Sequence, residues 1–470
     1  MMEYLRHLLN SCWEEEEVPG EWRQGVIVKL PKKGNLSNCD NWRGITLLSV
    51  PGKVFSAILL NRLKAAIDGK LREEQAGFRS NRSCTEQIFV LRTVIEQCLE
   101  FQKSLIINFI DFQKAFDSIH RETLWKIASL YGIPPKFIAM FKNLYQNSKC
   151  CIKTKYGNTE FFDIVSGVRQ GCLLSPLLFS LAIDYVMRQT VNKHNCGIPW
   201  TTTQNLTDLD FADDISLLSE TTTMMQTATS NLENEAIKVG LRINENKTKT
   251  MNIRGPDPKI CVNGKTIENV HKFTYLGSIL AIDGDVEVDI NSRIGKASAV
   301  FNRMTKLWKS NTISTAVKVR LYKSVVLSTC LYASETWKST SRTARKLNVF
   351  HQRCLRKIFK ISYRQHITNE EILRRSGSCM RLSDIVEERR MRLAGHILRL
   401  ADNRMPKIAM KWTPLKGKRA RGRPKKTWRR TFQEDLQKRG LKLEDAPLLA
   451  QDRTKWRTLA ARCTELYWRN

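Results

Sequence analysis

Two short apolar segments, far apart in the chain, each place carboxylates at one end. Residues 105–111 (LIINFID) form an isoleucine-rich run that predicts a buried strand ending at Asp111. Residues 206–220 (LTDLDFADDISLLSE) carry apolar stretches on both sides of Ala-Asp-Asp, which predicts a hairpin with Asp213 and Asp214 at its tip. Charge at the edge of an apolar core is costly unless the protein uses it, so these carboxylates are the first candidate site.

The segments around these strands have helical patterns. Apolar residues recur at helical spacing over 124–131, and Gly132 predicts the end of that helix. Threonines at 221–223 lead into a second helix that should end at Gly240, and residues 248–253 predict a returning strand. Strands that alternate with helices and include a hairpin predict an α+β fold, in which helices pack on one face of a sheet.

A sheet would bring Asp111, Asp213 and Asp214 together, where their charges repel. Two carboxylates about 4 Å apart repel by about 4 kcal/mol at an effective dielectric constant near 20, so the group needs divalent cations or shifted pKa values. Oxygen ligands with no histidine nearby in the sequence suit Mg²⁺ or Mn²⁺. Two such ions about 3.5–4 Å apart activate a 3′-hydroxyl and stabilise the leaving pyrophosphate, which is nucleotidyl transfer.

Two structural alternatives apply to these acidic residues. An Asp-Asp pair by itself is most often an exposed turn, and it is the strongly apolar flanks that favour a site at residues 213–214. Asp117 follows Asp111 after a helix has begun, so the two side chains need not point to the same place. We interpret Asp117 as a hydrogen-bond acceptor at a helix start rather than as a metal ligand.

The charge balance indicates a polyanionic partner. The chain has 78 Lys and Arg against 46 Asp and Glu, a formal net charge of +32, which favours nucleic acid. The longest nearly apolar stretch, residues 173–183, is far shorter than the roughly 20 residues of a spanning helix, so no membrane segment is expected. The acidic N-terminus does not resemble a signal peptide, so we expect a nuclear and cytoplasmic protein that is not secreted.

Seven segments, in order, resemble the motifs of the reverse transcriptases of non-LTR (LINE-type) retrotransposons, with RTE-like character. Two match the fingers motifs, and five match motifs A to E. They are LPKKGNLSNCDNWRGITLLS at 30–49, QAGFRS at 75–80, IDFQKAFDSI around Asp111, SGVRQGCLLSPLLF at 166–179, FADD at 211–214, GLRINENKTK at 240–249 and FTYLGS at 273–278. So many motifs in the right order are very hard to obtain by chance.

This resemblance implies a right-hand polymerase fold and an RNA-directed DNA polymerase. Fingers and palm would span residues 1–283, a helical thumb 284–345, and a mainly helical, basic Trp/Arg-rich region 346–470. The enzyme would add deoxynucleotides to a DNA primer on an RNA template, with two Mg²⁺ ions or with Mn²⁺. Relatives usually carry an endonuclease ahead of the polymerase, and we expect this chain to lack it.

The resemblance also assigns metal and sugar-selecting roles. Asp111 and Asp213 would be the principal metal ligands, Asp214 the supporting carboxylate, and the backbone of Phe112 a further ligand. Phe116 falls where the family places a bulky side chain that clashes with a ribose 2′-hydroxyl. The alternative for Phe116 is a core residue of the motif A helix.

Further residues would contact the incoming nucleotide. Lys32 and Arg43 fall where the fingers bind the triphosphate, a use suited to a point charge and a forked donor, although Lys29 and Lys33 are alternatives to Lys32. Gln170 and Gly171 would line the nucleotide and template side, since glycine allows close backbone approach. Lys247 matches a proton donor to the leaving pyrophosphate, or it is a solvated loop lysine.

The C-terminal region contains the basic run KGKRARGRPKKTWRR at 416–430. Its centre is similar to an AT-hook core, which enters the minor groove of A·T-rich DNA. A phosphate-binding tail or a nuclear localisation signal explains the same residues without sequence preference. Tryptophans in this region either stack on bases or pack into a small core. The candidate DNA-binding residues are Arg421, Gly422, Arg423, Pro424, Lys425 and Lys426.

Two other classes of protein compete with the polymerase. One is a catalytically idle retroelement remnant that acts only by binding nucleic acid, and the other is a group II intron-type maturase. The retained carboxylates argue against the remnant, because an idle site has no physical reason to keep costly charges. The FADD tip and the lack of a recognisable HNH nuclease cluster argue against the maturase. Oligomeric state, target site and template identity are not determined by the sequence.

Overall fold

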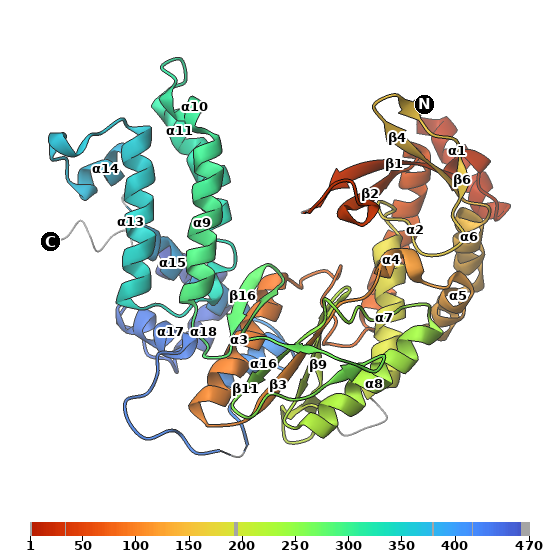
Figure 1. Ribbon diagram of the computed structural model, residues 1–470. Helices are drawn as coiled ribbons and strands as arrows, with labels where there is room; N and C mark the ends of the chain where they lie inside the picture. Colours follow the sequence, from red (N-terminus) through yellow and green to blue (C-terminus); the bar gives the residue numbers. More distant parts are fainter. Residues whose placement is uncertain (1, 33, 192–195, 378–379, 416, 462–470) are drawn as a thin grey trace.

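The computed structural model describes residues 2–32, 34–191, 196–377, 380–415 and 417–461. Figure 1 shows a sheet at the base of the molecule, with a strand-containing lobe on one side and a lobe of upright helices on the other. We call these the palm sheet, the fingers lobe and the thumb lobe. The fingers lobe contains α1 (Met2–Glu14), β1 (Gln24–Pro31), β2 (Trp42–Leu47), α2 (Val50–Asp68), β4 (Lys149–Thr154), β5 (Gly157–Asn158) and β6 (Phe162–Asp163).

The palm sheet has five strands in the order β14-β11-β3-β10-β9. The central strand β3 pairs antiparallel with both β10 and β11, and β9 and β10 form the predicted hairpin. The strands are β3 (Leu105–Ile110), β9 (Asp208–Phe211), β10 (Asp214–Ser219), β11 (Lys249–Ile253) and β14 (Glu268–Asn269). The strand predictions are therefore confirmed, and the carboxylates predicted at the strand ends lie at an edge of this sheet.

Helices cover both faces of the palm sheet, so the expectation of a single covered face is wrong. All six residues of β3 are buried, and alternate side chains belong to different cores. Ile106 and Ile110 pack with α7 (Ser175–Val191) and α8 (Thr222–Lys238). Leu105, Ile107 and Phe109 pack in the core that contains α3 (Cys84–Glu100). Because side chains alternate along a strand, a strand that is apolar throughout needs a cover on each side.

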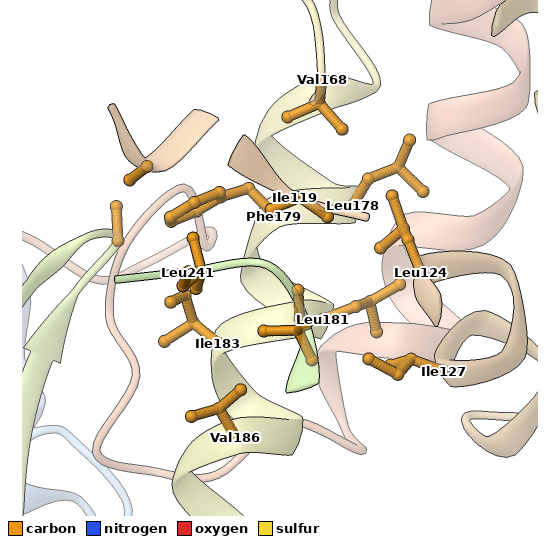
Figure 2. Packing of buried hydrophobic residues seen from close by; sticks show 14 of the residues in the cluster. Ile119, Leu124, Ile127, Val168, Leu178, Phe179, Leu181, Ile183, Val186 and Leu241 are labelled. Carbon is orange, nitrogen blue, oxygen red and sulfur yellow. The ribbon is translucent and has the colours of Figure 1, made fainter. Parts of the chain in front are cut away.

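One core of the palm lies between α7 and the helices next to it. α5 (Arg121–Leu130) and α6 (Pro135–Tyr145) follow the short helix α4 (Ala115–Ser118). Figure 2 shows Leu178 and Leu181 of α7 directed toward Leu124 and Ile127 of α5. These side chains are at most 2 % exposed, so we expect truncation of any of them to alanine to cost about 2–5 kcal/mol.

The C-terminal helices form the cover on the second face of the palm. They are α15 (Leu382–Leu398), α16 (Met405–Lys411), α17 (Trp428–Gln437), α18 (Ala446–Gln451) and α19 (Arg453–Ala461). Trp428 packs edge-on against Phe89 of α3, with ring centroids 4.7 Å apart. Trp412, Trp428 and Trp456 are each at most 6 % exposed, so these tryptophans pack in a core and do not stack on bases. Trp468 lies outside the described residues.

The thumb lobe has its own core. It is built by α9 (Glu287–Arg303), α10 (Thr305–Lys309), α11 (Thr315–Leu321), α13 (Ser341–Ile358) and α14 (Asn369–Arg375), with the start of α15. Its buried cluster runs from Val286 to Val386, and the boundary expected between residues 345 and 346 falls inside α13. We propose that the thumb unit extends over 286–386, because a helix whose face is buried in one core belongs to one unit.

None of the described helices combines the length and the apolar character that crossing a membrane requires.

Candidate active site

The three predicted carboxylates meet at one edge of the palm sheet. β3 and β10 pair antiparallel with Ile110 opposite Ile215. One further step in this register places Asp111, the residue after β3, opposite Asp214, the first residue of β10. Asp213 directly precedes Asp214 in the turn that joins β9 to β10. Hydrogen bonding between two strands therefore brings together residues that are far apart in the sequence.

The turn that presents Asp213 has a left-handed residue. Phe211 and Asp214 are paired, which leaves Ala212 and Asp213 as a two-residue turn. Ala212 has φ +60°, while Asp213 is not among the residues with positive φ. This is the pattern of a type II′ turn, whose first central position usually holds glycine. The hairpin thus holds an alanine in a conformation that favours glycine, and such strain requires support from neighbouring structure.

All three carboxyl groups have raised pKa values. Burial raises the pKa of Asp111 and that of Asp213. Burial, together with the charges of Asp213 and Asp111, raises the pKa of Asp214 to about 6. Burial and, at Asp214, the neighbouring carboxylates therefore make negative charge costly at this edge, which is the electrostatic condition that favours binding of a cation.

The carboxylates fit a hard divalent cation by their chemistry. Asp111 Oδ2 is buried and accepts no hydrogen bond from any described residue. The three side chains supply oxygen ligands, as Mg²⁺ prefers. Among the described residues, no three His, Cys, Asp or Glu side chains are already arranged to hold a metal ion. In the described part of the chain, the three carboxylates are therefore possible ligands that lie near one another and not a preformed cage.

The loop before β11 fixes the backbone of Asp111. The N–H of Asp111 donates to Thr248 Oγ1 at 3.2 Å, and its carbonyl accepts from the N–H of Asn244 at 2.7 Å. The same loop carries Lys247, whose Nζ lies 3.6 Å from Asp111 Oδ2. The side chain of Lys247 is 68 % exposed, so its ammonium group stands in the open site beside the carboxylate.

Two cations of the fingers lobe face the same carboxylates. Lys32 directly follows β1, and Arg43 lies opposite Leu30 in β2. Although burial dominates the shift, the charge of Lys32 acts to lower the pKa of Asp111, and that of Arg43 acts to lower the pKa of Asp213. Both side chains are exposed. The structure therefore places the two predicted triphosphate contacts within electrostatic reach of the palm.

Of the alternative lysines, Lys29 is engaged elsewhere. Its Nζ lies over the ring of Trp42, 5.3 Å from the centroid. Lys32 Nζ donates to the carbonyl of Asp40 at 3.1 Å and stays exposed. Lys33 lies outside the described residues. Between Lys29 and Lys32, the geometry favours Lys32 as the residue that faces the site.

Gln170 and Gly171 form the junction between fingers and palm. The carbonyl of Gln170 accepts from the N–H of Thr46 at 2.7 Å. A Cβ on Gly171, which has φ +120°, would lie 2.4 Å from the carbonyl oxygen of Thr46, so only glycine fits here. The side chain of Gln170 donates to Asp117 at 3.3 Å. Asp117 lies in the first turn of α4, where no side chain caps the helix. Its carboxylate is an acceptor, as predicted, but the donor is the side-chain amide of Gln170 and not the start of the helix.

The arrangement agrees with a known protein family. The family model described as "Reverse transcriptase (RNA-dependent DNA polymerase)" matches residues 30–280. The chain belongs to the reverse transcriptase family. Its palm sheet with the carboxylate edge, the fingers lobe and the helical thumb lobe are the parts of the right-hand polymerase fold, so the predicted fold class is confirmed.

Curated relatives are proteins of non-LTR retrotransposons, which agrees with a LINE-type reverse transcriptase. The Transposon TX1 uncharacterized 149 kDa protein of Xenopus laevis is 28% identical over 52% of this chain and 19% of its own length. The RNA-directed DNA polymerase from mobile element jockey of Drosophila melanogaster is 24% identical over 76% of this chain and 40% of its own length. This chain thus spans less than half of these relatives. A solved telomerase structure from Candida albicans has a TM-score of 0.45 and 12% identity, covering 80% of this chain and 68% of that one.

In this reverse transcriptase chain the two phenylalanines after Asp111 have different environments. Phe112 is buried, and its backbone bridges to Ile243. Phe116 is partly buried, stacks on Phe179 at a centroid distance of 4.3 Å, and meets Phe78 edge-on. Phe116 is thus anchored against the core by Phe179 while part of its side chain stays exposed.

A buried ionic network behind the reverse transcriptase hairpin was not predicted from the sequence. Arg72 donates to both carboxylate oxygens of Asp208, at 3.1 and 2.7 Å, and to Asp210 at 2.7 Å. Asp208 and Asp210 are both completely buried on β9. Their spacing of two residues places them on the same face of that strand, which was the available signal. The sequence could not identify Arg72 as their partner.

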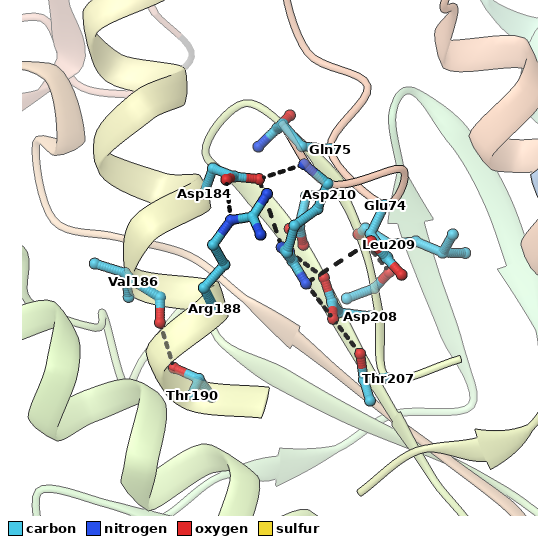
Figure 3. A network of polar contacts seen from close by, with 12 residues as sticks. Glu74, Gln75, Asp184, Val186, Arg188, Thr190, Thr207, Asp208, Leu209 and Asp210 are labelled. Atoms are coloured by element: carbon cyan, nitrogen blue, oxygen red, sulfur yellow. Dashed lines mark hydrogen bonds and ion pairs between the residues drawn. The ribbon is translucent and has the colours of Figure 1, made fainter. Parts of the chain in front are cut away.

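The network extends to α7. Asp184, also completely buried, accepts from the backbone N–H of Arg72 and from Nε of Arg188, each at 2.8 Å, and from the hydroxyl of Tyr131. Figure 3 shows Asp184, Asp208 and Asp210 gathered from α7 and β9, with Arg188 beside Asp184. Three acids and their cations thereby tie β9 to the long palm helix α7.

The charges in this network are unequally shared. Although burial acts to raise it, Arg72 holds the pKa of Asp208 below its ordinary value. Burial and the charge of Asp208 raise the pKa of Asp210 well above its ordinary value. Burial and the neighbouring charge thus favour the protonated form of Asp210, which helps two adjacent carboxyl groups to share one guanidinium group.

The segment before α3 supports the strained turn directly. Gln75 Oε1 accepts from the N–H of Ala212 at 3.0 Å and from the N–H of Gly77 at 2.8 Å. The N–H of Ala76 donates to the carbonyl of Asp210 at 2.9 Å. A Cβ on Gly77 would lie 2.1 Å from the nitrogen of Ala212. The second fingers motif thus lies against the β9–β10 hairpin that carries Asp213 and Asp214, a role that its sequence did not show.

The basic tail does not join the carboxylates. Residues 417–420 contact the end of α3, where the N–H of Ala420 donates to the carbonyl of Glu100 at 3.3 Å. At the other end of α3, burial and the charge of Asp214 act to raise the pKa of Cys84, so this end of the helix lies near the carboxylates. The helix has 17 residues and is therefore about 25 Å long. The predicted DNA-binding residues 421–425 are exposed, and Lys426 forms an ion pair with Glu434.

Proposed function

We propose that this chain is an RNA-directed DNA polymerase of a non-LTR retrotransposon, which adds deoxynucleotides to a primer 3′-hydroxyl. The observation that carries the proposal is the convergence of Asp111, Asp213 and Asp214, all with raised pKa values, at the palm edge that Lys32 and Arg43 face. Family membership supports the same conclusion. Its partners would be an RNA template, a DNA primer or target, and deoxynucleoside triphosphates.

The metal-binding residues in this proposal are Asp111 and Asp213, with Asp214 and the backbone of Phe112 in support. Two bound Mg²⁺ ions, or Mn²⁺, would activate the 3′-hydroxyl and stabilise the charge on the leaving pyrophosphate. The fixed backbone of Asp111 holds this residue beside Asp214 of the hairpin. The strained turn holds Asp213 at the sheet edge.

The remaining residues bind and orient the nucleotide. Lys32 and Arg43 would bind the triphosphate, Lys32 as a point charge and Arg43 through the forked donors of its guanidinium group. Gln170 and Gly171 would let the nucleotide and template approach the backbone closely. Lys247 would hold a proton beside Asp111 and donate it to the pyrophosphate as it leaves.

Primer extension tests the polymerase. The purified chain, an RNA template with an annealed DNA primer, deoxynucleotides and Mg²⁺ should give extension that falls at least about 1000-fold in the Asp213→Asn, Asp214→Asn double variant. The matched control is Asp163→Asn with Asp257→Asn, two exposed acids outside the site. Failure of the wild-type chain to extend, with retained and steeply salt-dependent duplex binding, would instead support the nucleic-acid-binding remnant.

Phe116 is proposed to select deoxynucleotides. Phe116→Ala should raise the incorporation of ribonucleotides relative to deoxynucleotides by about 10-fold or more, as expected for removal of a steric contact in a pocket. Phe161→Ala, at a 51 % exposed position outside the core, is the control. A variant that loses stability with unchanged sugar selectivity would show that Phe116 is only a core residue stacked on Phe179.

The basic tail is proposed to bind nucleic-acid phosphates and to act as a nuclear localisation signal. Residues 421–425 are exposed, and a run of cations of this kind binds phosphate without base readout. Replacing Arg421, Arg423 and Lys425 by Gln should weaken binding of A·T-rich and G·C-rich duplexes equally. A loss confined to the A·T-rich duplex would instead support the AT-hook interpretation.

A further inference from the structure

A basic groove runs along the outer face of α13 in the thumb lobe. It has a volume of about 1350 Å³ and is bordered by α13, the start of α14 and the start of α15. None of the described residues that line it is acidic. Six cations come from α13 and the residues that follow it, and Arg381 stands at the far edge. They are Arg342, Arg345, Arg353, Arg356, Lys357 and Lys360.

The cations form a stripe because of helical periodicity. The buried side of α13 is marked by Leu347, Phe350 and Leu355, which pack in the thumb core. Arg345 and Arg356 lie on the opposite side, since residues three, four, seven and eleven apart share a face. From residue 342 to residue 356 the stripe is about 21 Å long, which spans several phosphates of a nucleic-acid strand.

Much of this charge is not neutralised by the protein. Among the residues that the structure describes, Arg345, Arg353 and Arg356 have no carboxylate within 4.0 Å, whereas Arg342 pairs with Glu287 at 3.0 Å. Arg356 donates only to neutral oxygens, the carbonyl of Ile367 and the side chain of Asn369. Like charges held side by side repel, so the groove is an electrostatic site for a polyanion.

The groove is separate from the carboxylate site. None of its lining residues belongs to the palm sheet or the fingers lobe. Figure 1 shows α9 standing between α13 and the fingers lobe. Contacts from Lys346 to Glu287 and from Arg353 to Ser298 mark the edge of the groove that lies next to α9. A strand bound in the groove would therefore lie outside the polymerase site.

Neutral polar groups line the groove between its cations. Asn348, Asn369 and Ser383 line it beside the arginines. Asn348 and Ser383 are hydrogen-bonded to each other, and Gln352 donates to the carbonyl of Asn369 at 3.2 Å. These groups hold the walls of the groove in place and leave its cations to contact a bound strand. Arginine planes also stack on the unpaired bases of single-stranded RNA.

We propose that the α13 groove binds single-stranded RNA, as a second RNA site outside the polymerase centre. Arginines of the stripe contact its phosphates and stack on its unpaired bases. The proposal deepens the proposed polymerase function, because it gives template RNA a contact away from the point of copying. It does not require that the chain polymerise.

The test compares two triple variants of the full chain that remove the same charge. The groove variant is Arg345→Gln, Arg353→Gln, Arg356→Gln, and the control is Arg6→Gln, Lys126→Gln, Lys142→Gln, at exposed positions of α1, α5 and α6. Binding of a labelled RNA of about 30 nucleotides is measured against salt concentration. The groove variant should bind at least about 10-fold more weakly, and its salt slope should fall by about 2, since each phosphate contact on a single strand contributes about 0.7.

Two further measurements complete the test. Val349→Arg adds a cation at a 61 % exposed position in the groove and should tighten RNA binding. Extension of a short primer–template, confined to the palm, should be the same in both triple variants. Absence of extension in wild type would overturn the polymerase proposal and leave the RNA-binding result intact. Equal RNA binding by the two triple variants would overturn the assignment of RNA binding to the groove. If the groove variant lost affinity for single-stranded DNA of the same sequence as much as for RNA, the assignment to RNA would be overturned.

Discussion

The side-chain oxygen of Gln75 accepts a hydrogen bond from the backbone N–H of Ala212 at 3.0 Å, across 137 residues of sequence. Gln75 is completely buried, and its amide also lies 3.5 Å from the carbonyl of Ala212. The residue that stabilises the strained turn therefore comes from the fingers motif. We infer that Gln75 is a positioning residue, which acts on the reaction through the hairpin that carries Asp213.

Gln75→Leu should therefore impair both stability and turnover. It leaves the N–H groups of Ala212 and Gly77 buried and unpaired, which costs about 1–3 kcal/mol for each group. Thermal unfolding should shift downward, and primer extension should show a lower kcat with little change in the KM for deoxynucleotides. Gln102→Leu, at an exposed glutamine, is the control. A changed unfolding midpoint with unchanged kcat would mean that Gln75 is only structural.

Gly77→Ala should be strongly destabilising, in contrast to a second glycine. Its Cβ would lie 2.1 Å from the nitrogen of Ala212, where the hairpin backbone cannot move away without displacing Asp213. We expect a loss of at least about 2–3 kcal/mol in unfolding free energy. Gly295, within α9, has open space around its Cβ position, so Gly295→Ala should instead stabilise by about 0.5–1 kcal/mol. Equal effects in denaturant unfolding would contradict this close contact.

Arg72→Met should lower the free energy of unfolding, because it removes the cation that pairs with two buried acids. Removing the cation leaves Asp208 and Asp210 buried without this partner, and breaking a buried pair in this way costs about 3–5 kcal/mol. Adding Asp208→Asn should recover part of the loss, because it removes the unpaired carboxylate charge. A double-mutant cycle in urea measures the coupling. Additive effects of the two substitutions would show that Arg72 and Asp208 do not interact.

The raised pKa of Asp214 predicts a pH-dependent stability in EDTA. Its pKa is about 6 in the folded chain and about 3.9 when unfolded. Stability from this group is thus fully present below about pH 4 and is lost as the pH rises through about 6. Asp214→Asn should match the wild type near pH 4. Above about pH 7 the variant should be the more stable in thermal unfolding, by about 1 kcal/mol or less, because solvent reaches residue 214 and screens its partly buried charge. Mg²⁺ should reduce the difference, and a pH-independent difference would refute the assignment.

The sequence by itself determined those parts of the site that lie within one strand, one turn or one motif. Two strands are indicated by the apolar run before Asp111 and by the apolar stretches on both sides of residues 212–214, because a buried strand needs apolar side chains. Glycine at position 171 signalled a close backbone approach, and the structure shows that approach to Thr46. The motif order was sufficient to indicate the family.

The tertiary structure alone decided which distant groups meet. Arg72 finds Asp208 and Asp210, and Gln75 finds Ala212, only because the segment before α3 pairs with the outer edge of β9. No periodicity encodes a contact across 137 residues. Helices on both faces of the palm likewise follow from packing, since each strand specifies that a face is buried but not which element buries it. The sequence determined the carboxylates, and the fold determined what holds them in place.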